Sequence, residues 1–185
     1  MKALIFGESC TDVFNYGECV RLCPDAPVPV FNLIKSVKTL GMAKNVENNL
    51  NSLGVETFLI TNENYSDITK SRFIDDRTNH MFIRVDKGDN SYGVFKKEKL
   101  NFINFSEFDA VVVSDYNKGF FPNEILEEIS KSHPLTIIDT KRQLGAWANN
   151  FSFIKLNHSE YQNNKSNITP ALEKNIIVTR GTLGC

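Results

Sequence analysis

The sequence lacks an excess of charge of either sign, and it lacks a long hydrophobic run. Its 185 residues carry 21 basic and 22 acidic side chains, for a formal net charge of -1. This balance indicates neither a nucleic-acid nor a membrane partner. No apolar segment approaches the length of a membrane span, and Met1–Phe6 runs straight into Gly7 as a first strand would, unlike a signal peptide. We therefore expect a cytoplasmic protein.

Cysteine and histidine are few and form no recognisable motif. Cys19 and Cys23 have a spacing that could suit a metal, but no second cysteine pair or nearby histidine completes a site. The three histidines are scattered along the chain and belong to no triad. We expect reduced thiols with no catalytic or metal-binding role.

Several nucleotide-binding and catalytic motifs are also missing. The sequence contains no G-x-G-x-x-G and no G-x-x-x-x-G-K-[ST], so neither a classical dinucleotide fold nor a P-loop is supported. It contains no G-x-S-x-G and no H-E-x-x-H, which leaves the common hydrolase nucleophile and zinc-protease motifs unsupported.

One stretch of the first half is strongly patterned. Gly41–Gly54 opens with a glycine and then predicts a helix, because Val46, Leu50 and Leu53 fall at i, i+4 and i+7. Gly54 closes this helix, and a strand at Glu56–Thr61 follows. The N-terminus of such a helix can hold a polar or anionic ligand. An ordinary amphipathic helix of an α/β domain explains the same pattern.

The rest of the first half is irregular. A first strand at Lys2–Gly7 is followed by a predicted turn at Glu8–Asp12, the place where open α/β sheets bind ligands. Prolines exclude a helix from Cys19–Pro29. Further strands are predicted at Val28–Ile34, Ile68–Asp75 and Met81–Asp86. The last two carry Lys70, Arg72 and Arg84, cations that could hold a phosphate or simply face solvent.

The second half predicts a doubly wound parallel sheet. Four strand-like runs each end in a polar cluster, and they lie at Ala110–Ser114, Leu135–Ile138, Phe153–Leu156 and Asn175–Thr179. A helix is predicted at Pro122–Lys131, with proline at its start. Strand and helix in alternation indicate parallel pairing, so the polar ends should share one edge of the sheet and form a ligand site there.

Six segments resemble one family of enzymes. They are RLCPDAPVPVF (21–31), GMAKNVENNLNSLG (41–54), VVVSDYNKG (111–119), IDTK (138–141), LNHSE (156–160) and VTRGTLG (178–184). Their order is similar to that of the ribokinase-like, PfkB-type carbohydrate kinases, and most similar to the D-glycero-D-manno-heptose 7-phosphate kinases. The resemblance implies a doubly wound, mostly parallel sheet with flanking helices and a small β lid, formed by residues of about 19–34 and 68–87. Residues 1–185 would then be the N-terminal and central part of a single kinase domain.

The resemblance also implies ATP-dependent phosphorylation of a sugar or sugar phosphate, in heptose synthesis for a surface polysaccharide, with ATP and Mg²⁺ as cofactors. The substrate-binding residues would be Asp12, Gly41, Asn45 and Arg72. The nucleotide and magnesium region would contain Asn157, Glu160, Thr179 and Gly181, with Glu160 reaching Mg²⁺ through water. Asp115, Lys118, Asp139 and Lys141 would lie beside the site.

The sequence also departs from the family pattern. Met42 replaces the second glycine of a glycine pair. A side chain at this position should keep the sugar from approaching the backbone closely. The segments between Ile60 and Ile68 and between Tyr161 and Lys174 are short for the family. The G-A-G-D segment, which supplies the catalytic base and an anion hole, is expected beyond Cys185, so no catalytic base is assigned among these residues.

Three functional hypotheses follow. The first is a sugar kinase whose remaining part is supplied by further chain. The second is a reduced, non-catalytic relative that binds a sugar phosphate or a partner. The third is a plain α/β scaffold. In each case an unpaired sheet edge would favour a homodimer or a complementing chain that covers it.

Overall fold

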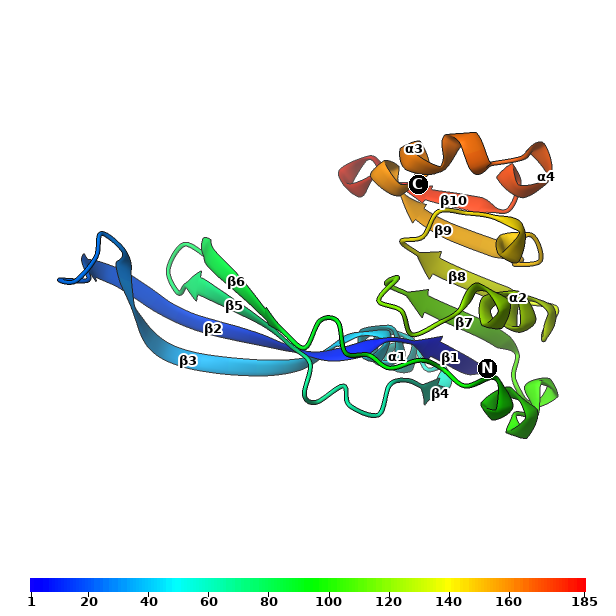
Figure 1. Ribbon diagram of the computed structural model, residues 1–185, viewed down its shortest axis with the longest axis horizontal. Coiled ribbons are helices and arrows are strands. Elements are labelled where there is room, and N and C mark those ends of the chain that lie inside the picture. The colour runs from blue at the N-terminus through cyan, green and yellow to red at the C-terminus, as the bar shows by residue number, and fades with distance from the viewer.

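The computed structural model describes residues 1–185 and divides into a core sheet and a lid sheet (Figure 1). The core sheet has six strands in the order β10-β9-β8-β7-β1-β4, and all of its neighbouring strands are parallel. The strands are β1 (Lys2–Gly7), β4 (Glu56–Ile60), β7 (Ala110–Asp115), β8 (Thr136–Thr140), β9 (Phe153–Asn157) and β10 (Ile176–Thr179). The expected parallel sheet is confirmed, and its polar strand ends do lie at one edge.

Short helices connect these strands. They are α1 (Ala43–Ser52), α2 (Asn123–Lys131), α3 (His158–Asn164) and α4 (Pro170–Glu173), with 3-10 turns at Lys97–Phe102, Phe105–Glu107, Ala146–Ala148, Lys165–Asn167 and Gly181–Leu183. The predicted helix at Pro122–Lys131 is confirmed as α2, with Pro122 as its N-cap. Ile125, Leu126 and Ile129 of α2 are buried in the core. No helix is long and apolar enough to cross a membrane.

Helix α1 ends as expected but is less buried than expected. Gly54 has φ +78°, its N–H donates to Asn51, and the N–H of Val55 donates to Leu50, which together form a Schellman motif. The predicted apolar stripe is only partly right. Val46 and Leu50 are half-buried, but Leu53 is 79% exposed because it lies at the C-cap, beyond the last helical residue.

The lid sheet has four strands in the order β3-β2-β5-β6. Its long hairpin pairs β2 (Ser9–Leu22) with β3 (Pro29–Met42), and the shorter hairpin pairs β5 (Thr69–Asp75) with β6 (Met81–Lys87). Figure 1 shows the lid projecting from the core on the side to which the arrowheads of β7–β10 point. The predicted turn at Glu8–Asp12 is wrong, because the chain passes from β1 through Glu8 directly into β2.

The two faces of the core sheet are covered unequally. On one face a cluster of 22 buried side chains fills the space under α2 and the connecting segments. On the other face α1 packs near β4, β1 and β7. Ile5 of β1 is completely buried on this face, whereas Phe153 of β9 and Ile177 of β10 are 41% and 40% exposed. The side chains of this face are therefore more exposed near β10 than near β1. The outer edge of β10 pairs with no other strand.

Candidate functional site

A cleft of about 300 Å³ lies between the lid and the carboxyl edge of the core sheet. We call it the lid cleft, and its lining residues come from the four lid strands, from the segment after β6 and from the loops that follow β7 and β8. They are Asp12, Met42, Lys70, Arg72, Arg84, Asp86, Asp89, Tyr116, Lys118 and Lys141. Among the predicted site residues, Asp12, Arg72, Lys118 and Lys141 are thus brought together.

Strand register places the charged lid residues on one face. Asp12 of β2 lies opposite Lys70 of β5, and Lys70 lies opposite Asp86 of β6. Two residues further along, Arg72 lies opposite Arg84. Side chains two apart on a strand share a face, so the alternating charges of β5 and β6 all line the lid cleft.

Most charges of the lid cleft are paired. The Arg72 guanidinium contacts the Asp12 carboxylate at 2.5 Å, and Arg84 binds Asp86 with its Nε at 2.7 Å. Lys70 and Lys118 both bind the Asp89 carboxylate. Because Lys118 belongs to a core loop and Lys70 to the lid, Asp89 joins the two parts of the molecule.

The charge state of Asp89 follows from these contacts. Burial raises the pKa of this carboxyl, but hydrogen bonds from Lys118, Lys70 and Tyr92 outweigh burial and lower the pKa to about 2. Asp89 is therefore ionised at neutral pH. The burial of Tyr92 and its hydrogen bond to Asp89 both raise the pKa of the tyrosine hydroxyl, which stays protonated as the donor.

Gly41 supports Asp12 and does not line the lid cleft. A Cβ at Gly41 would lie 2.3 Å from Oδ2 of Asp12 and 2.9 Å from Sγ of Cys10. The absence of a side chain at Gly41 therefore lets the Asp12 carboxylate lie against the neighbouring strand. Cys10 beneath it is completely buried, and burial raises the pKa of its thiol to about 11.

Met42 occupies a backbone conformation that normally favours glycine. Its φ is 59° and its ψ is -125°, at the N-cap of α1. A non-glycine residue in this region is strained by about 1–3 kcal/mol. The Met42 side chain is buried, and its sulfur lies 3.4 Å from the oxygen of the Tyr92 hydroxyl. The backbone at Met42 thus has a conformation that glycine would adopt without strain.

Glu8 fixes the junction between core and lid. Its buried carboxylate accepts hydrogen bonds from the backbone N–H of Tyr116 at 2.9 Å and of Lys118 at 3.0 Å. Burial raises the pKa of Glu8, and the nearby Asp115 raises it further, while the two N–H donors oppose this shift. These contacts hold the loop after β7 against the start of β2.

A second cavity of about 620 Å³ lies at the ends of β9 and β10, and we call it the strand-end cavity. Its lining brings together three predicted nucleotide-region residues, Asn157, Thr179 and Gly181. Arg180, which has no carboxylate partner, also lines it. Hydroxyl, amide and guanidinium groups at a strand end are suitable for contacting phosphate oxygens.

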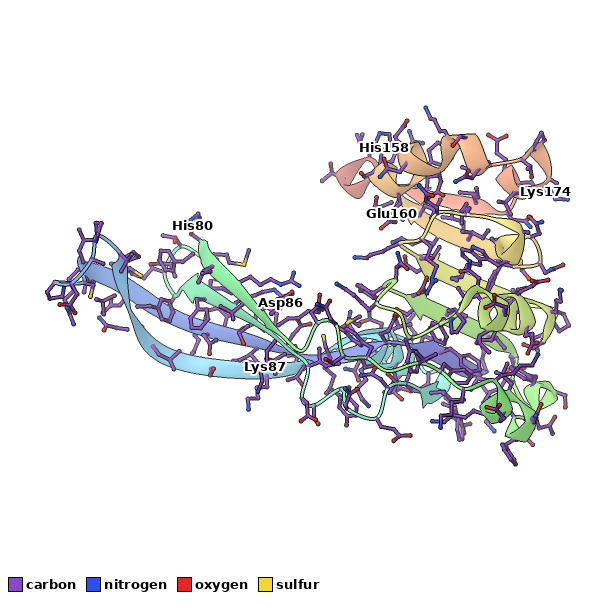
Figure 2. All side chains as sticks on the ribbon, viewed as in Figure 1. His80, Asp86, Lys87, His158, Glu160 and Lys174 are labelled. Atoms are coloured by element: carbon purple, nitrogen blue, oxygen red, sulfur yellow. The ribbon has the colours of Figure 1, made fainter.

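Asn157 and Glu160 form a capping box at the start of α3. Asn157 Oδ1 accepts from the Glu160 N–H at 2.8 Å, and the Glu160 carboxylate accepts from the Asn157 N–H at 2.7 Å. Glu160 also lines a third cavity of about 300 Å³ with Lys141, Arg142, Gln143, Asn163 and Asn164, which we call the Glu160 cavity. Figure 2 shows Glu160 at the edge of the core that is turned towards the lid, where Asp86 lies.

The residues fit an indirect magnesium site only. No group of three or more histidine, cysteine, aspartate or glutamate side chains could hold a metal ion by itself. Mg²⁺ usually keeps several waters and binds through one or two carboxylates and substrate phosphates. Glu160, with one carboxylate oxygen bound to the α3 cap, is suitable for contacting such a hydrated ion.

Like Gly41, three further predicted residues line none of these cavities. The completely buried carboxylate of Asp115 binds the Arg142 guanidinium at 2.7 Å and the Thr140 hydroxyl at 2.7 Å, so it holds two loops together. Asp139 lies on the open face of the sheet, paired with Lys155 at 3.0 Å. Asn45 is exposed in the first turn of α1 and does not line the lid cleft.

Sequence reasoning missed several residues of these cavities. Asp89, Tyr92 and Glu8 were not assigned to the site, and nothing in their local sequence marks them. Asp86 could have been found, because the alternation of Arg84 and Asp86 on one strand matches that of Lys70 and Arg72 on the next. Arg180 could have been found from its place directly after the last predicted strand.

Solved structures share this arrangement over most of the chain. A carbohydrate kinase from Agrobacterium tumefaciens matches with a TM-score of 0.65 and 14% identity, over 97% of this chain and 70% of the other. The Arabidopsis thaliana ribokinase complexed with ribose and ATP also has a TM-score of 0.65, with 10% identity, over 97% of this chain and 72% of the other. The chain has the ribokinase-like fold. The expected fold class is thereby confirmed.

Sequence comparison agrees with the predicted resemblance. The bifunctional protein HldE of Helicobacter pylori is 32% identical, and the alignment covers 87% of this chain and 42% of the relative. The HldE protein of a Nitratiruptor species is 28% identical over 76% of this chain and 36% of the relative. The ribokinase-like chain thus spans about two fifths of the length of the curated relatives that it matches. No protein-family model matches it.

Proposed function

We propose that the chain belongs to an ATP-dependent sugar kinase and binds a sugar phosphate, of the heptose 7-phosphate type, in the lid cleft. Such a kinase would serve the synthesis of a heptose-containing surface polysaccharide. The observation that carries the proposal is the lid cleft itself. It combines five cations with three carboxylates at the carboxyl edge of a ribokinase-like sheet, where open α/β folds bind ligands.

The charges of the lid cleft fit a phosphorylated sugar. Five cations against three carboxylates leave an excess of two positive charges, which suits a phosphate group. The carboxylate of Asp12 can accept hydrogen bonds from sugar hydroxyls, and Arg72 holds it in place. ATP would place its phosphates near Asn157, Thr179 and Gly181, and Mg²⁺ would supply charge neutralisation there, with Glu160 contacting its waters.

A second candidate function is binding without phosphoryl transfer. It is favoured by the state of the carboxylates in the lid cleft. Asp12, Asp86 and Asp89 are each paired with a cation, so none stands free to accept the proton of a sugar hydroxyl. Such a binder would still recognise the same sugar phosphate.

A partner on the open sheet face is part of the proposal. The exposed Phe153 and Ile177 and the unpaired edge of β10 would be covered by a second copy or by a complementing chain. A concentration-dependent mass in analytical ultracentrifugation is expected for a homodimer. A constant monomer mass over a hundredfold range of concentration would contradict it.

The decisive experiment is ligand-induced stabilisation. D-glycero-D-manno-heptose 7-phosphate at about 100 times its Kd should stabilise the chain by about 2.7 kcal/mol and raise its Tm by roughly 5–10 °C. Asp12→Ala should abolish the rise, because the hydroxyl acceptor is lost. Asp25→Ala, in the exposed tip of the long hairpin, serves as the control and should keep it. An unchanged Tm of the wild-type chain would contradict the proposed function.

A further inference from the structure

One cation of the lid cleft differs from the other four. Lys70, Arg72, Arg84 and Lys118 are each bound to a carboxylate of the cleft. Lys141 makes no ion pair, and its ammonium lies 4.4 Å from the centre of the Tyr116 ring. A lysine over an aromatic face is held weakly, and such a contact does not neutralise its charge. Lys141 is therefore free to bind an incoming anion.

Lys141 is also shared by two cavities. It lines the lid cleft, and it lines the Glu160 cavity. The position follows from the fold, because Lys141 comes directly after β8 and its backbone N–H donates to the carbonyl of Asp115 at the end of β7. The lysine stem thus starts from the carboxyl edge of the sheet, between the lid and α3.

We propose that Lys141 binds the phosphoryl group that passes between the two ligands, and that it therefore contacts the newly added phosphate of the product. The inference rests on the proposed function, in which the sugar occupies the lid cleft and the nucleotide phosphates lie on the side of Glu160. A group transferred between them passes the boundary of the two cavities, where Lys141 lies. An ammonium there neutralises negative charge on the transferred group without itself exchanging a proton.

The other charged groups near this boundary are already engaged. Arg142 binds the buried Asp115, and one oxygen of Glu160 binds the backbone of the α3 cap. Lys118 binds Asp89. A phosphate that bound Arg142 or Lys118 at the boundary would have to break an ion pair. A phosphate that bound Lys141 would displace only the weak contact between its ammonium and the Tyr116 ring.

The test compares a sugar monophosphate with its bisphosphate and needs no catalysis. Isothermal titration calorimetry measures the Kd of heptose 7-phosphate and of the corresponding heptose bisphosphate for the wild-type chain and for Lys141→Met. The wild-type chain should bind the bisphosphate about tenfold to a hundredfold more tightly, as a charge-assisted hydrogen bond would provide. Lys141→Met should remove this preference, because it should weaken the binding of the bisphosphate about tenfold more than the binding of the monophosphate.

Two further variants separate charge from structure. Lys141→Arg keeps the positive charge and should retain most of the preference for the bisphosphate. Lys155→Met removes a half-buried lysine on the open face of the sheet and should leave both Kd values unchanged.

The outcomes distinguish this inference from the proposed function. If the wild-type chain binds neither sugar phosphate, both are overturned. If it binds the monophosphate but Lys141→Met keeps the preference for the bisphosphate, or weakens both ligands equally, only the role of Lys141 is overturned.

Discussion

The core sheet and the lid sheet differ in the side-chain contacts between their strands. The core strands carry aliphatic side chains that are buried in one contiguous cluster. The lid exposes aliphatic side chains such as Leu33, Ile34 and Ile83, and ion pairs cross its strands, such as those of Arg72 with Asp12 and of Lys70 with Asp86. The core is thus stabilised by the removal of apolar surface from water, whereas the lid carries paired charges that the proposed sugar phosphate would contact.

The difference teaches where stability and function lie. Hydrophobic burial is worth about 25 cal/mol per Å² and does not depend on pH. Ion pairs at partly exposed positions contribute little to stability and are sensitive to pH and salt. The contacts of the lid should therefore be more sensitive to pH and salt than those of the core.

The largest expected effect is a loss of stability, and it is tested by replacing one isoleucine of the core and one of the lid with alanine. Ile129→Ala in α2 removes a side chain that is completely buried, and it should lower the free energy of unfolding by about 2–5 kcal/mol. Ile83→Ala in β6 removes a side chain that is 57% exposed, and it should cost less than about 1 kcal/mol. Urea denaturation followed by circular dichroism measures both. Equal losses would mean that the lid contributes to the cooperative core as strongly as α2 does.

The ion pairs that join lid and core should show a distinct pH dependence. The folded pKa of Asp89, about 2, lies below the ordinary value of 3.8, so its ionised form stabilises the folded state above pH 3.8. This contribution, about 2 kcal/mol for such a shift, is lost as the pH falls from 3.8 towards 2. Asp89→Asn should therefore be less stable than wild type by about this amount at neutral pH, and the difference should shrink as the pH falls below the ordinary pKa.

Urea denaturation of both proteins between about pH 7 and pH 3 measures this difference. Asp25→Asn, at the exposed hairpin tip, is the control and should show no such convergence. A difference that stays constant with pH would show that the loss in Asp89→Asn has another cause.

A smaller effect is expected at the junction of the two sheets. Met42→Ala and Met42→Gly both remove the buried thioether. Only glycine adopts the positive φ of 59° without backbone strain. We expect Met42→Gly to be more stable than Met42→Ala by about 1 kcal/mol, because Met42 is the N-cap residue, where glycine is also preferred to alanine. Thermal unfolding of the two variants gives the comparison. The reverse order would mean that the backbone at Met42 is not strained.

Much of the core sheet could be predicted from the sequence. Its strands are continuous runs of apolar residues, such as Ala110–Ser114. Such a run can be found from neighbouring residues alone. The start of α2 at Pro122 and the end of α1 at Gly54 were also predicted, because proline and glycine act on the backbone near their own position. The strand register on the lid, and with it the shared face of Lys70, Arg72, Arg84 and Asp86, was only partly recognised.

Other features were decided by contacts between residues far apart in the chain. The continuous strand from Ser9 to Leu22 replaced the predicted turn, because Glu8 is bound to the loop after β7 and β2 pairs with both β3 and β5. The buried Asp115 was assigned beside the site, but its partner Arg142 is 27 residues away and binds its carboxylate fully. A sequence pattern does not show which distant cation will reach a carboxylate.

The sequence by itself determined the alternating strands and helix of the second half, the polar ends of the parallel strands and the family resemblance. Each of these depends on local periodicity or on short motifs. Only the tertiary structure decided which charges are free and which are paired, because pairing depends on distances between β2, β5, β6 and the loops after β7 and β8. Lys141 illustrates the difference, since its motif placed it at a strand end and the fold alone left it without a carboxylate between two cavities.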